Sequence, residues 1–161
     1  MEALKVTIYT DGSCRGNPNG PGGYGTVLLY TDPKGQIHRR ELSEGFESST
    51  NNRMELMAVI AGLEALIRPC EVELHSDSQY VINAFNKGWL SSWESHGWKK
   101  SNREPVLNVD LWKRLLEAAK PHRIIWVWVR GHDGDPENEC CDRLAVEAAL
   151  KCSRHERSNT D

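Results

Sequence analysis

Four carboxylates stand where predicted secondary-structure elements meet. Asp11 and Asp77 each end a predicted strand, Glu55 lies in the first turn of a predicted helix, and Asp142 lies in the last predicted helix. Ligands of open α/β sheets bind beyond the carboxyl ends of strands, so Asp11 and Asp77 lie side by side if their strands are neighbours. Clustered carboxylates repel one another unless a divalent cation shares their oxygens, and oxygen ligands favour Mg²⁺ or Mn²⁺. One acid at a strand end is most often a solvated loop residue, but the set of four indicates a metal site.

His132 is the candidate for proton transfer near these acids. It lies in the segment "GHDGDP", whose glycines at 131 and 134 predict a mobile loop, and a histidine titrates near neutral pH. An ordinary surface histidine is the alternative interpretation.

The apolar periodicity predicts the elements that position these side chains. Predicted strands cover residues 5–11, 24–31, 36–45, 70–77 and 123–130, and predicted helices cover 50–67, 78–85, 108–120 and 136 to about 151. Residues 88–105 are expected to be irregular, and the last strand to be buried. This order predicts an α/β fold with a five-stranded mixed sheet, three antiparallel strands followed by two parallel ones, flanked by helices. We expect one domain over residues 1–151 and a polar, disordered tail over residues 152–161.

The segment "GPGGYG", Gly20 to Gly25, matches the dinucleotide-binding pattern G-x-G-x-x-G. That pattern requires a helix directly after its glycines, because the helix N-terminus receives the pyrophosphate. Here the apolar, β-branched segment "TVLLYT" follows, which predicts a strand. We therefore interpret the glycines as the turn that lets the first strand double back, and we expect no organic cofactor.

Composition restricts the function classes further. The formal net charge is −3, so nucleic-acid binding must come from local patches rather than from a global positive field. The five cysteines form no C-x-x-C pair, which argues against a disulfide framework and a zinc site. No apolar run approaches the roughly 20 residues of a membrane span, and residues 1–10 do not resemble a signal peptide. We expect a cytoplasmic protein without membrane association.

Five motifs together resemble bacterial ribonuclease H of the type 1 class. They are "TDGSCRGNP", "TNNRMELMA", "SDSQYV", "NVDLW" and "GHDGDPENECCDRLA", and the resemblance covers about residues 4 to 150. It implies the ribonuclease-H-like fold, a monomer, and hydrolysis of the RNA strand of RNA–DNA hybrids by two Mg²⁺ ions, with Mn²⁺ as a substitute. The products would carry a 5′-phosphate and a 3′-hydroxyl.

The resemblance also implies roles for individual residues. Asp11 would bridge the two ions, Glu55 and Asp77 would complete one metal site, and Asp142 would complete the other. His132 would transfer protons. Glu139, three residues before Asp142, would assist metal or product release, although a solvated helix carboxylate is nearly as good an interpretation.

Further residues would contact the hybrid, again by resemblance. The minor-groove set comprises the backbone near Cys14, Arg15 and Gly16 together with Asn17, Asn52 and Gln79, whereas Thr50 and Asn51 would hold the DNA strand. The protruding basic segment that we call the handle (residues 88–105) would meet DNA phosphates through Trp89, Trp93, Trp98, Lys99 and Lys100. Cap or turn duty is the alternative for each asparagine. We expect Trp112, Trp126 and Trp128 to pack in the core.

Two departures from the family pattern affect rate and binding more than reaction type. The handle has Glu94, Ser95 and His96 where the family carries a basic run, which predicts weaker hybrid binding. Asp133 and Asp135 flank His132, and such charges raise a histidine pKa or attract a further cation.

Two rival functions stay open on the residues alone. One is another metal nuclease of the same superfold, such as a DNA resolvase or an integrase core, since fold does not fix substrate. The other is a non-catalytic hybrid-binding module. The motif "TNNRMEL" with Gln79 weighs against the first rival, and the four intact acids weigh against the second.

Overall fold

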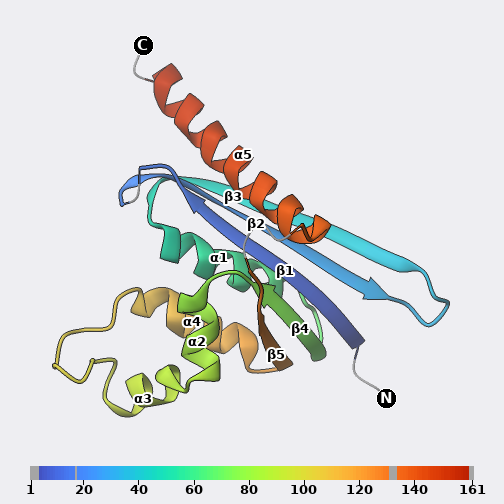
Figure 1. The fold of residues 1–161 in the computed structure, drawn as a ribbon, viewed down its shortest axis with the longest axis horizontal. Coiled ribbons are helices and arrows are strands. Elements are labelled where there is room, and N and C mark those ends of the chain that lie inside the picture. Colours follow the sequence, from blue (N-terminus) through green and yellow to red (C-terminus); the bar gives the residue numbers. More distant parts are fainter. Residues whose placement is uncertain (1–3, 17, 131–133, 160–161) are drawn as a thin grey trace.

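A single five-stranded sheet organises the chain (Figure 1). The computed structural model describes residues 4–16, 18–130 and 134–159, with side chains described as far as residue 152. In chain order the elements are β1 (Leu4–Cys14), β2 (Gly20–Thr31), β3 (Ile37–Ser49), α1 (Asn51–Glu64), β4 (Cys70–Ser76), α2 (Gln79–Asn86), α3 (Trp89–Ser95), α4 (Val109–Ala119), β5 (Arg123–Trp128) and α5 (Pro136–Asn159).

The strand order is β3-β2-β1-β4-β5, which confirms the predicted mixed sheet. The strands β1, β2 and β3 pair antiparallel, whereas β4 pairs parallel to both β1 and β5. In the central parallel pair, Thr10 is opposite Ser76. The carboxyl ends of β1 and β4 therefore meet at one edge, where the sequence had placed two acids.

Helices cover both faces of the sheet, and neighbouring residues of β2 show which helix lies where. The buried Thr26 hydroxyl donates to the carbonyl oxygen of Ala58 in α1 at 2.7 Å. The next residue, Val27, packs with Cys141 of α5. Because successive side chains of a strand point to opposite faces, α1 and α5 lie on opposite sides (Figure 1). The larger core lies on the α1 side and includes Trp112, which is fully buried as predicted.

The glycines at the start of β2 form part of the strand, so our interpretation of "GPGGYG" as a turn was wrong. Gly22 and Gly25 pair with Cys14 and Asp11 of β1, and the chain reverses before Gly20. Glycine is needed at Gly23 because of a helix that comes much later in the chain. A Cβ atom on Gly23 would stand 2.4 Å from the carbonyl oxygen of Ala145, so only glycine lets α5 pack this closely on β2.

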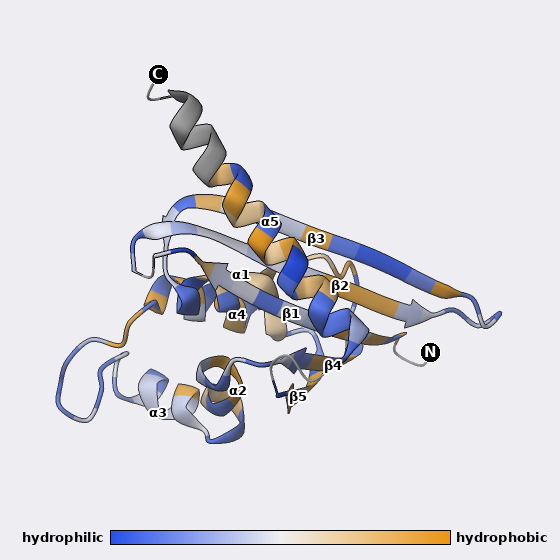
Figure 2. Cartoon of the chain, turned by 45° about the horizontal axis from the view of Figure 1, so that its top comes forward, coloured by the Kyte–Doolittle hydropathy of each residue, from blue (hydrophilic) through white to orange (hydrophobic). Residues whose placement is uncertain are grey.

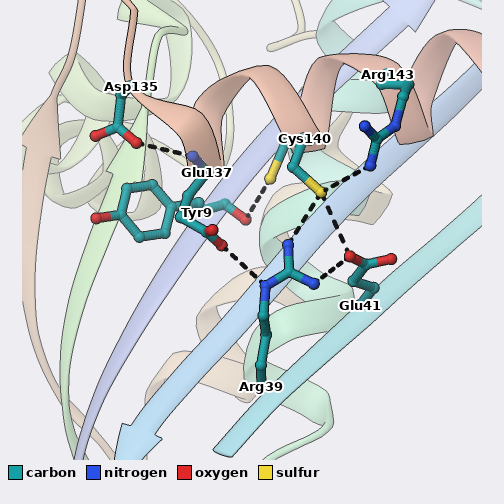
Figure 3. A network of polar contacts seen from close by, with 8 residues as sticks. Tyr9, Arg39, Glu41, Asp135, Glu137, Cys140 and Arg143 are labelled. Atoms are coloured by element: carbon teal, nitrogen blue, oxygen red, sulfur yellow. Dashed lines mark hydrogen bonds and ion pairs between the residues drawn. The ribbon is translucent and has the colours of Figure 1, made fainter. Parts of the chain in front are cut away.

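A polar network ties the beginning of α5 to β3 (Figure 3). The Arg39 guanidinium donates to Glu137 through Nε at 3.3 Å and to the Cys140 thiol through Nη2 at 3.1 Å, and it also pairs with Glu41. The Asp135 carboxylate caps this helix, since it accepts from the Glu137 N–H at 2.9 Å. These contacts fix the end of α5 that carries Asp142. The helix continues to Asn159, past the expected end near residue 151.

The structure differs from the prediction in four further respects. The strand β1 runs past Asp11 to Cys14, β3 continues to Ser49, and the segment expected to be irregular contains α3. The strand β5 is not buried. It forms an edge of the sheet, and Ile125 is 63% exposed.

The strand β3 is hydrophilic along much of its length (Figure 2). In the part of the chain that the structure describes, no helix is long and apolar enough to cross a membrane.

Candidate active site

Three of the four acids come together at the edge where β1 and β4 end. Asp11, Glu55 and Asp77 each place a carboxylate oxygen within 4.8 Å of the others. Asp11 is the first residue of β1 beyond its pairing with β4, Asp77 directly follows β4, and Glu55 is the fifth residue of α1. The expected neighbourhood of Asp11 and Asp77 is therefore confirmed, although Asp11 lies within a strand rather than at its end.

Gly12 links two of these acids through its backbone. Its N–H donates to Asp11 Oδ1 at 2.9 Å and to Glu55 Oε1 at 3.0 Å. A Cβ atom at this position would stand 2.5 Å from the backbone nitrogen of Glu55, so a larger residue would push α1 away from β1. Gly12 thus sets the distance between the strand and the helix that carry the acids. The sequence analysis did not assign it this role.

Burial and mutual repulsion make the cluster costly to ionise. Asp11 is 9% exposed and Glu55 is 8% exposed. Burial, followed by the charge of Asp77, raises the pKa of Asp11 to about 8. Burial and the charges of Asp11 and Asp77 raise the pKa of Glu55 well above its usual range. The charge of Asp142 also raises the pKa of Asp11. Asp142, on α5, therefore acts electrostatically on the same cluster.

The cluster fits a divalent cation. Among the described residues, Glu55 Oε2 is the buried side-chain polar atom that lacks a hydrogen-bond partner. An unsatisfied buried carboxylate oxygen is unfavourable, and a cation shared with Asp11 and Asp77 would satisfy it. The donor set consists of oxygens alone, which suits hard cations.

Several residues predicted to contact the hybrid lie at the N-termini of α1 and α2. Thr50 caps α1 by accepting from the Arg53 N–H at 3.2 Å, so part of its expected duty is structural. Asn51, Asn52 and Gln79 are exposed at the first positions of α1 and α2.

The turn that follows β1 exposes two of the residues predicted to contact the hybrid. The Cys14 thiol donates to the carbonyl oxygen of Ser49 at 3.3 Å and is half-buried, whereas Arg15 and Gly16 are exposed. Asn17 and His132 lie outside the described residues. Glu139 is exposed on the first turns of α5.

The handle is held to the body by two of its three tryptophans. Trp93 packs edge-on against Trp112 with ring centroids 5.7 Å apart, and Trp98 faces Lys113. Trp89 is 37% exposed and lines a groove of about 450 Å³ with Trp93, Lys99 and Lys100. The two lysines are exposed, so the groove combines aromatic rings with positive charge.

Trp128 does not pack in the core, contrary to our expectation. It is 45% exposed, and its indole N–H donates to the main-chain oxygen of Asp77 at 3.2 Å. Trp126 is half-buried and stacks on Phe85 with ring centroids 3.8 Å apart. Because successive side chains alternate between the two faces of a strand, Trp126 and Trp128 lie on the same face of β5. Their different burial therefore comes from their different positions along the strand.

Comparison with known proteins identifies the family. The family model of RNase H matches residues 3–150. The chain belongs to the ribonuclease H family. Ribonuclease H of Lachnoclostridium phytofermentans is 62% identical over 146 residues, which cover 91% of this chain and 92% of that protein. Ribonuclease H of Desulforamulus reducens is 57% identical, covering 90% of this chain and 87% of that protein.

A solved ribonuclease H confirms the fold. The crystal structure of LC9-RNase H1, described as a type 1 RNase H with the type 2 active-site motif, superposes with a TM-score of 0.85 at 34% identity. The match covers 94% of this chain and 74% of that one. This ribonuclease H is therefore an enzyme that hydrolyses the RNA strand of RNA–DNA hybrids, and its family is metal-dependent.

Proposed function

We propose that this ribonuclease H cleaves RNA by a two-metal-ion hydrolysis at Asp11, Glu55, Asp77 and Asp142. The observation that carries the proposal is the cluster of three carboxylates within 4.8 Å, one of which has a buried oxygen without a partner. Bound cations would supply activation of the attacking water and stabilisation of the leaving 3′ oxygen. The products are a 5′-phosphate and a 3′-hydroxyl. We assign Mg²⁺, with Mn²⁺ as a substitute, because all the donors are oxygens.

Electrostatic coupling supports a division of the acids between two sites. The pKa of Asp11 responds to both Asp77 and Asp142, which suits a carboxylate that serves both ions. The pKa of Glu55 responds to Asp11 and Asp77, which suits a shared first site. Asp142 then belongs to the second site. The catalytic domain comprises residues 1–151.

His132 and Glu139 complete the proposed machinery. His132 exchanges protons with the reacting groups, since its ordinary pKa lies near neutrality. Glu139 assists release of metal or product from the exposed surface of α5, where its carboxylate faces solvent.

The exposed groups around the site suit an RNA–DNA hybrid. The backbone of Cys14, Arg15 and Gly16, with Asn17, Asn52 and Gln79, reads the minor groove, where 2′-hydroxyls distinguish RNA from DNA. Thr50 and Asn51 hold the DNA strand. The groove formed by Trp89, Trp93, Lys99 and Lys100, with Trp98 anchoring the handle, receives DNA phosphates. We further propose that the enzyme acts as a cytoplasmic monomer.

The Asp77→Asn variant tests the metal assignment. Loss of one ligand charge should lower hybrid cleavage in Mg²⁺ by about 10³-fold or more, because transition-state stabilisation by metal contributes several kcal/mol. Folding should persist. The matched control is Glu117→Gln, which makes the same change in charge on the exposed surface of α4. Near-normal activity of Asp77→Asn would refute the assignment.

A substrate panel separates the rival functions. Labelled RNA–DNA hybrid, double-stranded RNA, double-stranded DNA and a four-way junction are incubated with Mg²⁺ and again with EDTA. We expect cleavage of the hybrid alone, abolished by EDTA. Junction or duplex DNA cleavage would favour a resolvase or integrase type, and binding without cleavage would favour a non-catalytic module.

A further inference from the structure

Trp128 occupies the carboxyl end of β5, beside the loop that carries Asp77. In the parallel register it stands opposite Ser76, the last residue of β4. The residue is 45% exposed, so core packing does not account for a side chain of this size here. The indole N–H reaches across to the main-chain oxygen of Asp77 at 3.2 Å. Trp128 therefore contacts the backbone of the very residue whose carboxylate joins the acid cluster.

The loop between β4 and α2 also has fixed points at the residues that flank Asp77. The Val129 N–H donates to the Ser76 carbonyl oxygen at 2.9 Å, and the Ser78 N–H donates to the Ser76 hydroxyl at 3.0 Å. Ser78 also caps α2. The indole bond adds a restraint at Asp77 itself. A carboxylate held on a restrained backbone loses less conformational freedom when it takes up a cation than one on a mobile loop.

Resting on the function proposed above, we infer that Trp128 is a positioning residue for Asp77, whose indole N–H preorganises the acid cluster for a divalent cation. The ring contributes through the hydrogen bond rather than through contact with nucleic acid. Removing the bond weakens metal binding while the enzyme loaded with metal retains its turnover.

The Trp128→Phe variant removes the N–H and keeps an aromatic ring. Mg²⁺ alone is titrated into the free enzyme by calorimetry, and the half-saturating Mg²⁺ concentration, kcat and KM for the hybrid are measured in parallel. A hydrogen bond of ordinary net strength predicts a Kd for Mg²⁺ that rises about three- to tenfold. At saturating Mg²⁺, kcat and KM for the hybrid should return to the unsubstituted values. Ile125→Ala is the control, since it truncates another exposed apolar side chain of β5 away from Asp77.

A second replacement separates the hydrogen bond from the shape of the ring. Benzothienylalanine at position 128 keeps the bicyclic outline and replaces the N–H by sulfur. It should weaken Mg²⁺ binding as much as Trp128→Phe does. Wild-type Mg²⁺ affinity with this residue would overturn the inference, and so would a higher KM for the hybrid with unchanged metal affinity, which would indicate a direct nucleic-acid contact.

Failure of this inference is distinguishable from failure of the proposed function. If Asp77→Asn binds Mg²⁺ as tightly as the unsubstituted protein, Asp77 is not a ligand and the metal assignment fails. If Asp77→Asn loses Mg²⁺ binding while Trp128→Phe retains it in full, only the positioning role of Trp128 is wrong.

Discussion

Asp11 makes the stability of the metal-free protein depend on pH. Its pKa is about 8 in the folded chain, because of burial and the charge of Asp77, against an ordinary value near 3.8 in the unfolded chain. Between these values the folded state holds a proton that the unfolded state has lost. The free energy of unfolding therefore falls as the pH rises from about 4 to about 8.

This dependence is measurable by urea unfolding in EDTA between pH 5 and pH 9. We expect the stability of the unsubstituted protein to decline with pH relative to Asp11→Asn, which cannot lose this proton. Saturating Mg²⁺ should flatten the decline, because the cation replaces the proton as the partner of the carboxylates. Parallel pH profiles for the two proteins in EDTA would contradict the explanation.

The neighbourhood of Asp11 and Asp77 was predictable from sequence because each ends a strongly patterned predicted strand, and two such strands can pair in one sheet. Their pKa values and the role of Gly12 were not, since both depend on how closely α1 approaches β1. That approach is a property of the packed fold. Trp128 shows the same limit, because an apolar strand does not reveal from its own residues whether a helix will cover it.

The handle is an element that carries backbone strain. Arg103, in the loop between α3 and α4, has φ of 69°, a left-handed conformation that costs a residue with a Cβ atom roughly 1 kcal/mol. Arg103→Gly should therefore raise the free energy of unfolding by about 1 kcal/mol, or Tm by about 2–4 °C. Thermal unfolding checks this. Arg103→Ala removes the same charge but keeps the strain, so equal stability of the two variants would rule out the backbone explanation.

Glu94 of the handle predicts how hybrid binding responds to salt. It lies on α3, the helix whose Trp93 lines the groove that contains Lys99 and Lys100. Glu94→Lys should tighten hybrid binding several-fold at low salt and steepen the slope of log K against log salt by up to about one unit. Binding titrations at several salt concentrations measure both effects. Glu147→Lys, which adds the same charge on the exposed surface of α5, should change neither by as much.

The elements predicted best from sequence were those with a local cause. Thr50 and Asp135 begin their helices through side-chain caps, whose cause lies within three residues of each. The turn interpretation of "GPGGYG" failed because Gly23 and Gly25 pack against Ala145 and Cys141 of α5, more than 110 residues later in the chain. The helix α3 was missed because seven residues give too short a pattern to recognise.

At the scale of the whole molecule, the strand order determines where the fold is most resistant to opening. The strand β1 is central, with β2 on one side and β4 on the other, whereas β3 and β5 form the edges. Hydrogen exchange should be slowest for the β1 amides paired with β4 and β2, and faster in β5, whose second edge and one face meet solvent. Exchange followed by mass spectrometry or NMR tests this order. Equal protection of β5 and β1 would contradict it.

The late position of α5 in the chain has a consequence for synthesis. The hairpin strands, α1 and β4 leave the ribosome well before Asp142, which lies 65 residues after Asp77. The proposed fourth acid, Asp142, is carried by α5, which docks on Gly23 and Gly25 of β2. Since the proposed second metal site needs Asp142, we expect a nascent chain to lack nuclease activity until α5 has docked. Activity would then depend on the packing of α5 on β2 and not on the three clustered acids alone.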